Sequence, residues 1–387
     1  MADRGIVHLG HSAEGRTIRY CYIGVTVPLF DTDTAIAPLR ETILARIGAV
    51  VERGRFILGP EVEAFERELA SYLEVRHVIG VANGTDAITI ALRALGVRAG
   101  DDVVVPAFTF YASAEAVAGA GARPVFCDVD VETRNVTPDT VRAALTPRTT
   151  AIVAVDLFGI PAPMPELRAL GLPVLEDAAQ ALGASLGGRR AGVLGDVGTF
   201  SFFPSKNLGC FGDGGAIATD DDRIAELARA LRFHGSHDQR VFEYVGYNSR
   251  LDELQAAVLR VLLPELDGWC RGRRGAAAAY LASGVGDHVG LPVVPDGVEA
   301  AWHLFVVTHP RADELVRELS KRGIEARSYY RTPLHRQPAM APYANERVPL
   351  PATDELARTN LALPMSPVLA PAEADKVAAT IATVASS

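Results

Sequence analysis

An uncharged, aromatic run, Gly198-Thr199-Phe200-Ser201-Phe202-Phe203, leads directly into Pro204-Ser205-Lys206-Asn207-Leu208-Gly209. Aromatic and β-branched residues favour a strand, and the proline ends it. A lysine next to such a strand is partly stripped of water, which disfavours its ammonium form and leaves some amine free to attack a carbonyl. Lys206 is therefore a candidate Schiff-base lysine. The alternative is an ordinary surface lysine whose stem lies along apolar residues.

Further strand-like runs precede and follow this one. Between residues 77 and 233, short β-branched runs alternate with amphipathic stretches, which is typical of an α/β fold with a mostly parallel sheet flanked by helices. Thr137-Pro138, a capping residue followed by proline, begins a helix that ends at Leu145. We expect strands at residues 77–81, 103–106, 124–128, 151–156, 173–176, 198–203 and 215–219.

The pattern changes after Asn248. A long helical stretch over residues 251–281 is interrupted at Pro264, where proline breaks the hydrogen-bond ladder. Segments 302–308, 312–322 and 324–329 then read as strand, helix and strand, and a last helix opens at Pro371. We expect a flexible extension over residues 1–24, a large domain over 25–280 with an N-terminal helix and a connector helix, and a small α+β domain over 281–387.

Composition excludes several classes of function. The net charge of −9 argues against nucleic acid as a partner, because phosphate backbones are bound by clustered basic residues. No apolar run reaches the length of a membrane span, and the charged first residues do not form a signal peptide, so we expect a cytoplasmic protein. The four cysteines form no C-x-x-C pair, which indicates neither a metal site nor disulfides: Cys21, Cys127, Cys210 and Cys270.

Two other segments combine a strand end with polar residues. In Val174-Leu175-Glu176-Asp177-Ala178-Ala179-Gln180, Asp177 ends a buried strand and is expected to face the crevice where open α/β sheets bind ligands. A carboxylate there can pair with a protonated pyridine nitrogen, although Asp177 could instead cap a following helix. In Val81-Ala82-Asn83-Gly84-Thr85-Asp86-Ala87 a helix begins, and its free N–H groups suit a phosphate.

Taken together, these segments resemble the DegT/StrS family of sugar aminotransferases, which have the type I, aspartate-aminotransferase-like fold. The resemblance runs from about Pro28 to the C-terminus. Further matching motifs are Gly54-Arg55-Phe56-Ile57-Leu58-Gly59-Pro60-Glu61-Val62, Pro106-Ala107-Phe108-Thr109-Phe110, Gly212-Asp213-Gly214-Gly215-Ala216 and Asn248-Ser249-Arg250-Leu251-Asp252.

The resemblance implies a role for each matched residue. Lys206 would hold pyridoxal 5′-phosphate as a Schiff base, and Asp177 would pair with the pyridine nitrogen. Gln180 would lie beside the phenolic oxygen, and Phe110 would stack on the ring. The phosphate would be bound by Gly84, Thr85, Ser201 and, from a second subunit, Asn248. The family resemblance therefore also implies a homodimer with shared active sites.

The reaction of the family supplies the expected substrates. L-glutamate would convert the cofactor to pyridoxamine 5′-phosphate, which would aminate the keto group of a nucleotide-linked (dTDP or UDP) deoxy-keto-hexose. The stretch Phe108-Thr109-Phe110-Tyr111-Ala112-Ser113-Ala114-Glu115 resembles members that act at C3, and amination at C4 is the alternative. A non-catalytic sensor of the same family and an α/β binding protein without this cofactor are further alternatives. A related dehydratase is disfavoured, because it has histidine where Lys206 stands.

Contacts to the sugar are expected near Ser328-Tyr329-Tyr330-Arg331-Thr332-Pro333-Leu334-His335, where Tyr330 and His335 are the candidates. A histidine satisfied within its own loop is the alternative reading of His335. His234 also matches a family position, but a role at the C-terminus of a helix explains it as well. Ser366 departs from the family, which often has histidine there.

Overall fold

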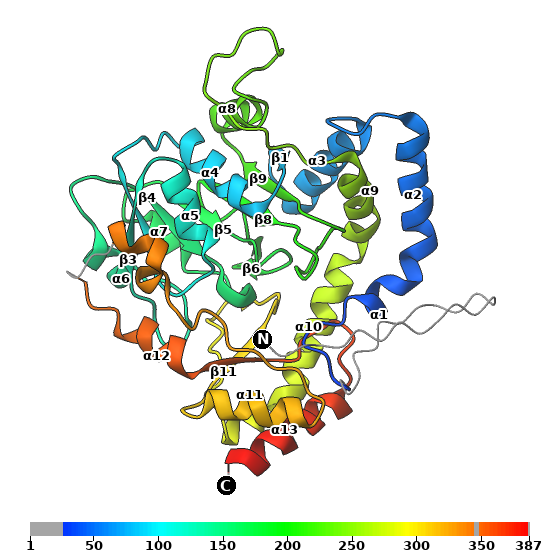
Figure 1. The fold of residues 1–387 in the computed structure, drawn as a ribbon, viewed down its shortest axis with the longest axis vertical. Coiled ribbons are helices and arrows are strands. Elements are labelled where there is room, and N and C mark those ends of the chain that lie inside the picture. The colour runs from blue at the N-terminus through cyan, green and yellow to red at the C-terminus, as the bar shows by residue number, and fades with distance from the viewer. Residues whose placement is uncertain (1–25, 344–347, 386–387) are drawn as a thin grey trace.

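The computed structural model describes residues 26–343 and 348–385, so the extension expected over residues 1–24 lies outside the described residues. All seven strands predicted between residues 77 and 219 are confirmed, with ends that differ by at most two residues. They are β1 (His77–Val81), β2 (Asp102–Pro106), β3 (Arg123–Cys127), β4 (Thr149–Val155), β5 (Val174–Asp177), β8 (Val197–Ser201) and β9 (Gly215–Thr219). They form one sheet in the order β1-β9-β8-β5-β4-β2-β3, at the centre of the molecule (Figure 1).

The sheet is mostly parallel. β9 runs against both of its neighbours, and the strands from β8 to β3 are parallel to one another. Every residue of β2 and β9 is buried, because strands inside this sheet are covered by helices on both faces. The carboxyl ends of β5, β4 and β2 therefore open at one edge of the sheet, where ligands of such folds bind.

Helices cover both faces. On one face α4 packs against β8 and β9, and on the other α3 and α9 enclose a cluster that contains Phe65, Phe200 and Phe202. The predicted cap at Thr137 is confirmed, since Thr137 and Thr140 form a reciprocal capping box at the start of α6, with Pro138 as the first helical residue. The helices are α2 (Arg40–Arg53), α3 (Pro60–Leu73), α4 (Gly84–Ala94), α5 (Ala112–Gly119), α6 (Pro138–Ala144), α7 (Met164–Arg168), α8 (Asp222–Arg232) and α9 (Glu253–Leu262).

The long helical stretch is interrupted at Pro264 as predicted. It consists of α9, the 3-10 turn η3 (Leu263–Glu265) and α10 (Leu266–Ala282). α10 contributes to two apolar clusters, with Cys270 against the main sheet and Tyr280 among the C-terminal elements. The domain boundary near residue 280 stays a prediction. None of the helices in the described ranges has the length and apolar character needed to span a membrane.

The C-terminal elements form a second, smaller layer. β11 (Phe305–Thr308) pairs antiparallel with β12 (Asn360–Leu363), and α11 (Ala312–Lys321) and α13 (Pro371–Ala385) pack together beside them (Figure 1). The remaining elements are α1 (Asp33–Ile36), η1 (Ala37–Leu39), η2 (Leu157–Gly159), β6 (Ser185–Leu186), β7 (Arg189–Arg190), η4 (Val285–Asp287), β10 (Val298–Glu299), η5 (Leu334–Arg336), η6 (Pro338–Tyr343) and α12 (Pro351–Thr359).

The strand expected over residues 324–329 is wrong. Only isolated bridges occur there: Ile324 pairs with Val27, and Arg327 pairs with Ala362. The partner of β11 is β12, which follows much later in the chain. The segment thus changes its pairing partner within three residues, so no continuous ladder can form. Similarly, the strand expected from residue 302 begins at Phe305, because Trp302 has a left-handed backbone (φ 48°).

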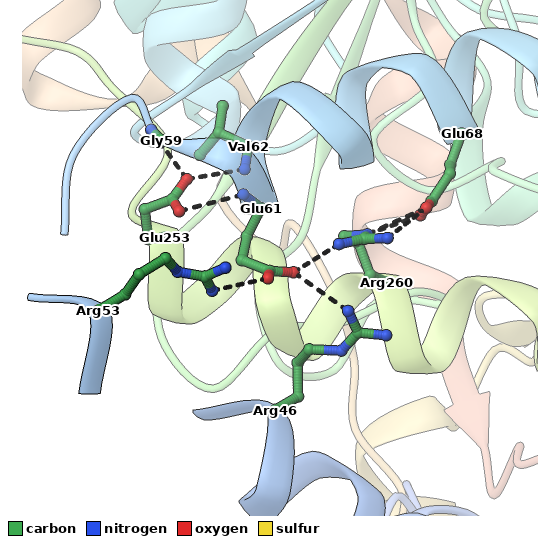
Figure 2. A network of polar contacts seen from close by, with 8 residues as sticks. All are labelled: Arg46, Arg53, Gly59, Glu61, Val62, Glu68, Glu253 and Arg260. Atoms are coloured by element: carbon green, nitrogen blue, oxygen red, sulfur yellow. Dashed lines mark hydrogen bonds and ion pairs between the residues drawn. The ribbon is translucent and has the colours of Figure 1, made fainter. Parts of the chain in front are cut away.

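One polar network ties α3 to α9 (Figure 2). The buried carboxylate of Glu253 accepts hydrogen bonds from the backbone N–H groups of Gly59 (2.9 Å), Glu61 (3.1 Å) and Val62 (2.8 Å). It thus caps the start of α3, whose N-terminal N–H groups have no acceptor within the helix. A Cβ at Gly59 would lie 2.6 Å from this carboxylate, so a larger residue there would displace the Glu253 side chain. The buried Glu61 in turn accepts from Arg53 and Arg260.

Replacement of Glu253 by alanine is expected to lower the free energy of unfolding by about 3 kcal/mol, because three buried N–H groups lose their acceptor. Urea unfolding followed by circular dichroism measures the change. Glu265→Ala, at an exposed position one turn beyond α9, is the matched control and should have little effect. Equal losses in the two variants would contradict the capping role of Glu253.

Candidate active site

Asp177 and Lys206 come together where β5 and β8 end. Asp177 is the last residue of β5, and Lys206 lies in the turn after β8, where its backbone N–H donates to the Phe203 carbonyl (2.8 Å). The next residue, Asn207, anchors this turn by donating from its side chain to the Ala301 carbonyl (2.8 Å). The charges of Asp177 and Lys206 stabilise each other. The sheet therefore brings the two predicted residues to the edge where ligands bind.

Lys206 is only partly accessible to solvent, and the surroundings of its amino group are those of a buried site rather than of a surface lysine. Burial lowers the pKa of Lys206 to about 8, and the charge of Asp177 opposes this shift. Roughly a tenth of the amine is then neutral at pH 7. The dry surroundings do not come from the three neighbouring phenylalanines, because Phe200 and Phe202 point into the core and Phe203 is half exposed.

The carboxyl group of Asp177 is held from two sides. The Ser113 hydroxyl donates to one oxygen (3.1 Å), and the Ala179 N–H donates to the other (3.2 Å). Burial raises the pKa of Asp177, whereas the Ala179 N–H, the charge of Lys206 and the Ser113 hydroxyl all act to lower it. The residues that follow Asp177 form turns, so Asp177 does not cap a helix there.

Three of the four residues expected to bind a phosphate meet at the start of α4. Asn83 caps this helix by accepting from the Asp86 N–H (2.8 Å), which leaves Gly84 and Thr85 in the first turn. Ser201, at the end of β8, is so close that a Cβ at Gly84 would lie 2.8 Å from the Cβ of Ser201. Only glycine permits this approach. A helix N-terminus with a hydroxyl beside it can hold a phosphate dianion.

Gln180 and Tyr330 are neighbours in the structure. The Gln180 amide donates to the Tyr330 hydroxyl (3.1 Å), and its oxygen accepts from the Phe158 N–H (2.9 Å). The rings of Phe158 and Tyr330 are stacked with centroids 6.0 Å apart. Both residues have left-handed backbones, with φ of 59° and 53°. Such strain in non-glycine residues is typical of functional sites, and Tyr330 is also close enough to feel the charge of Asp177.

Other predicted residues lie further from this centre. Phe110 has 59% of its surface exposed, and Asn248 is exposed at the base of the protruding loop that follows α8. His335 faces Asp354 (3.8 Å) and the ring of Phe126. Roles of these three residues in binding stay predictions. His234 adopts a left-handed conformation just after α8, consistent with its alternative role at a helix end.

Sequence reasoning missed Ser113 and Phe158. Ser113 lies within the stretch that was quoted for its resemblance to C3-acting enzymes, but nothing in its local pattern indicates a partner on β5. Phe158 reads as one more apolar core residue. Its contribution is the backbone N–H that it offers to Gln180, which depends on a φ value that no sequence pattern predicts.

Comparison with known proteins gives concordant matches. A model of the DegT/DnrJ/EryC1/StrS aminotransferase family matches residues 38–382. A pleiotropic regulatory protein of Geobacillus stearothermophilus is 45% identical over 89% of this chain and 95% of its own length. The dTDP-3-amino-3,4,6-trideoxy-alpha-D-glucose transaminase of Streptomyces venezuelae is 46% identical over 89% of this chain and 92% of its own.

Two further proteins complete the comparison. The UDP-N-acetyl-3-dehydro-alpha-D-glucosamine 3-aminotransferase of Acidithiobacillus ferrooxidans is 44% identical over 92% of this chain and 97% of its own. Among solved structures, S. venezuelae DesV in complex with a ketimine intermediate superimposes with a TM-score of 0.90 and 44% identity, covering 94% of this chain and 99% of that one. The fold is therefore that of type I transferases, as predicted.

The lowered pKa of Lys206 predicts the pH at which its amine becomes reactive. In protein freed of bound small molecules, labelling of Lys206 by trinitrobenzenesulfonate should rise with pH to a half-maximal rate near pH 8, because burial favours the neutral amine. Peptide mass spectrometry separates this site from exposed Lys321 and Lys376, the only other lysines, which report how the reagent itself responds to pH. A midpoint near 10.5 would contradict the buried environment.

Proposed function

This chain belongs to the DegT/DnrJ/EryC1/StrS aminotransferase family, and from that premise we propose that it moves an amino group from L-glutamate to the C3 keto group of a dTDP- or UDP-linked deoxy-keto-hexose. The observation that carries the proposal is the meeting of a buried amine, Lys206, with a buried carboxylate, Asp177, at the carboxyl edge of the sheet. A Schiff-base enzyme requires an amine with a lowered pKa, which can condense with a carbonyl, and a carboxylate close to it.

The residues at this edge fit pyridoxal 5′-phosphate. The space between Gly84 and Ser201 admits no side chain, and the adjacent helix start supports binding of the phosphate together with Thr85. Asp177 would pair with the pyridine nitrogen, and Gln180 would lie beside the phenolic oxygen. Phe110 would stack on one face of the ring. When bound, the cofactor supplies an aldehyde that condenses with amines and a ring that withdraws electrons from the neighbouring carbon.

The protein's own groups move the protons. Lys206, with a pKa near pH 8, can take a proton from the α-carbon of the donor and return one to the carbon that accepts nitrogen. Asp177 must stay ionised to hold a protonated pyridine, and the Ser113 hydroxyl and the Ala179 N–H stabilise that ionised form. Burial of the site keeps competing water away from the reacting carbon.

We further propose a homodimer in which Asn248 of one subunit completes the phosphate site of the other. The support is the exposure of large apolar side chains on the surface, which a monomer would rarely leave in water. These include Phe110, Phe203 and Phe211 near the site, and Val241, Phe242 and Tyr244 on the loop after α8. A cytoplasmic location stays a prediction.

Amination at C3 is favoured over C4 by the two similar transaminases, whose names both specify a 3-amino product. A regulatory function is the second candidate, because a relative of nearly equal identity is a pleiotropic regulatory protein. The complete set of Lys206, Asp177, Gln180, Gly84 and Ser201 at one sheet edge supports turnover rather than sensing alone.

Lys206→Ala is expected to abolish amination, with kcat falling by about 10³-fold or more, because the base and the cofactor anchor are both lost. Its melting temperature should stay close to that of the wild type, since removing a buried amine relieves desolvation. Lys321→Ala, at an exposed position of α11, is the matched control. Amination by the Lys206 variant at the control rate would overturn the assignment.

The substrate panel is a second test. The protein is incubated with L-glutamate and each of the dTDP- and UDP-linked 3-keto and 4-keto hexoses, and products are identified by mass spectrometry and NMR. We expect an amino group at C3. Products from the 4-keto sugars alone would show C4 amination, and failure of glutamate to convert the cofactor's visible absorption would favour the regulatory function.

A further inference from the structure

A second pair of acids lies beneath the site, on the opposite face of β5 from Asp177. Ala154 of β4 is level with Glu176 of β5, so Asp156, two residues beyond Ala154, emerges on the same face as Glu176. Both Asp156 and Glu176 have no exposed surface. Glu176 faces Asp156, and Asp156 is the titratable group that faces Glu176. The charge of Asp177, on the other face of β5, acts on Asp156 more weakly.

The hydrogen bonds of the two carboxyl groups differ. Glu176 accepts from three backbone N–H groups, those of Gly192 (2.6 Å), Leu194 (2.7 Å) and Gly195 (2.9 Å), so both of its oxygens are satisfied as a carboxylate. Asp156 accepts one bond through Oδ1, from the Ala162 N–H (2.9 Å). Its Oδ2 is buried and finds no donor among the described residues.

Two buried carboxylates side by side cannot both keep a negative charge, because the dry interior does not screen their repulsion. We propose that Asp156 and Glu176 share one proton, carried on Oδ2 of Asp156, and that neutral Asp156 is a positioning residue for the loop that holds Gln180. The proton turns the orphaned Oδ2 into a donor toward Glu176. Burial and the charge of Glu176 both raise the pKa of Asp156, in agreement with this geometry.

The neutral acid has two consequences for the site. Through the Ala162 N–H it closes the loop over residues 157–162, which contains the strained Phe158 whose N–H holds Gln180. By carrying no charge it also avoids repelling Asp177, which lies on the neighbouring strand and whose backbone carbonyl accepts a hydrogen bond from the Asp156 N–H (3.0 Å). Asp156 thus acts through Phe158 and Gln180 rather than on the reacting atoms.

The proposal predicts a particular dependence of stability on pH. The folded protein keeps the Asp156 proton, whereas the unfolded chain loses it above the usual pKa of 3.8. Stability from this group is therefore present at low pH and is lost as pH rises toward the folded pKa. Asp156→Asn keeps a donor toward Glu176 and an acceptor for Ala162 but has no proton to lose. The difference in melting temperature, Asp156→Asn minus wild type, should therefore increase by about 2 °C for each pH unit between pH 5 and pH 7.

Two other variants test whether the pH dependence is specific to Asp156 and whether the loop depends on the hydrogen bond that Asp156 accepts. Asp128→Asn is the matched control, because Asp128 accepts from the Ala352 and Thr353 N–H groups and from the Thr353 hydroxyl, as a carboxylate does. It should lower the melting temperature without any upward trend with pH. Asp156→Ala should lower kcat/KM by about 10-fold by freeing the loop, while Asp156→Asn should stay within about 3-fold of the wild type. A pH-independent gap between Asp156→Asn and the wild type would overturn the proposal.

Infrared spectroscopy of the wild-type protein tests the same point without relying on a variant that must fold. At neutral pH the carbonyl stretching band of a protonated carboxylic acid should be present, and Asp156→Asn should remove it. Absence of the band, or a band unchanged in the variant, would overturn the proposal. The thermal and infrared measurements do not use the enzymatic reaction, so their outcome is separate from that of the proposed function.

Discussion

The electrostatic pairing of Lys206 with Asp177 is the constraint around which the site is organised. Each group is costly to bury alone, and each lowers that cost for the other. Their separation is fixed by elements far apart in sequence: parallel β5 and β8 set the strand ends, Ser113 orients the carboxylate, and Asn207 anchors the turn. A change in any of these supports acts on the chemistry without touching a reacting atom.

Buried acids are used in three different ways in this chain. Glu253 accepts hydrogen bonds from three helix N–H groups, and Asp177 is stabilised by a hydroxyl, an N–H and a nearby ammonium. Asp156 accepts from a single donor, and a proton on its other oxygen removes the unpaired buried charge. The count of donors, rather than depth of burial, distinguishes the three cases.

Local pattern was sufficient to predict the central sheet, because its strands are continuous apolar runs separated by clear turn residues. The same strands placed Asp177, Lys206, Gly84 and Ser201 near one another, since parallel strands end at a common edge. The strand expected over residues 324–329 was wrong, because the partner of β11 is β12, which is distant in the chain and was not predicted from local pattern. Phe158 and Ser113 escaped notice because their contributions depend on backbone torsion and tertiary contact, which single-residue preferences do not encode.

The scarcity of lysine has a practical consequence. Besides the buried Lys206, side-chain amines occur at Lys321 on α11 and Lys376 on α13, and these two helices pack together in the C-terminal layer (Figure 1). Coupling to an amine-reactive resin through side chains would therefore tether the molecule by that layer. Immobilised molecules would share one attachment face, formed by α11 and α13.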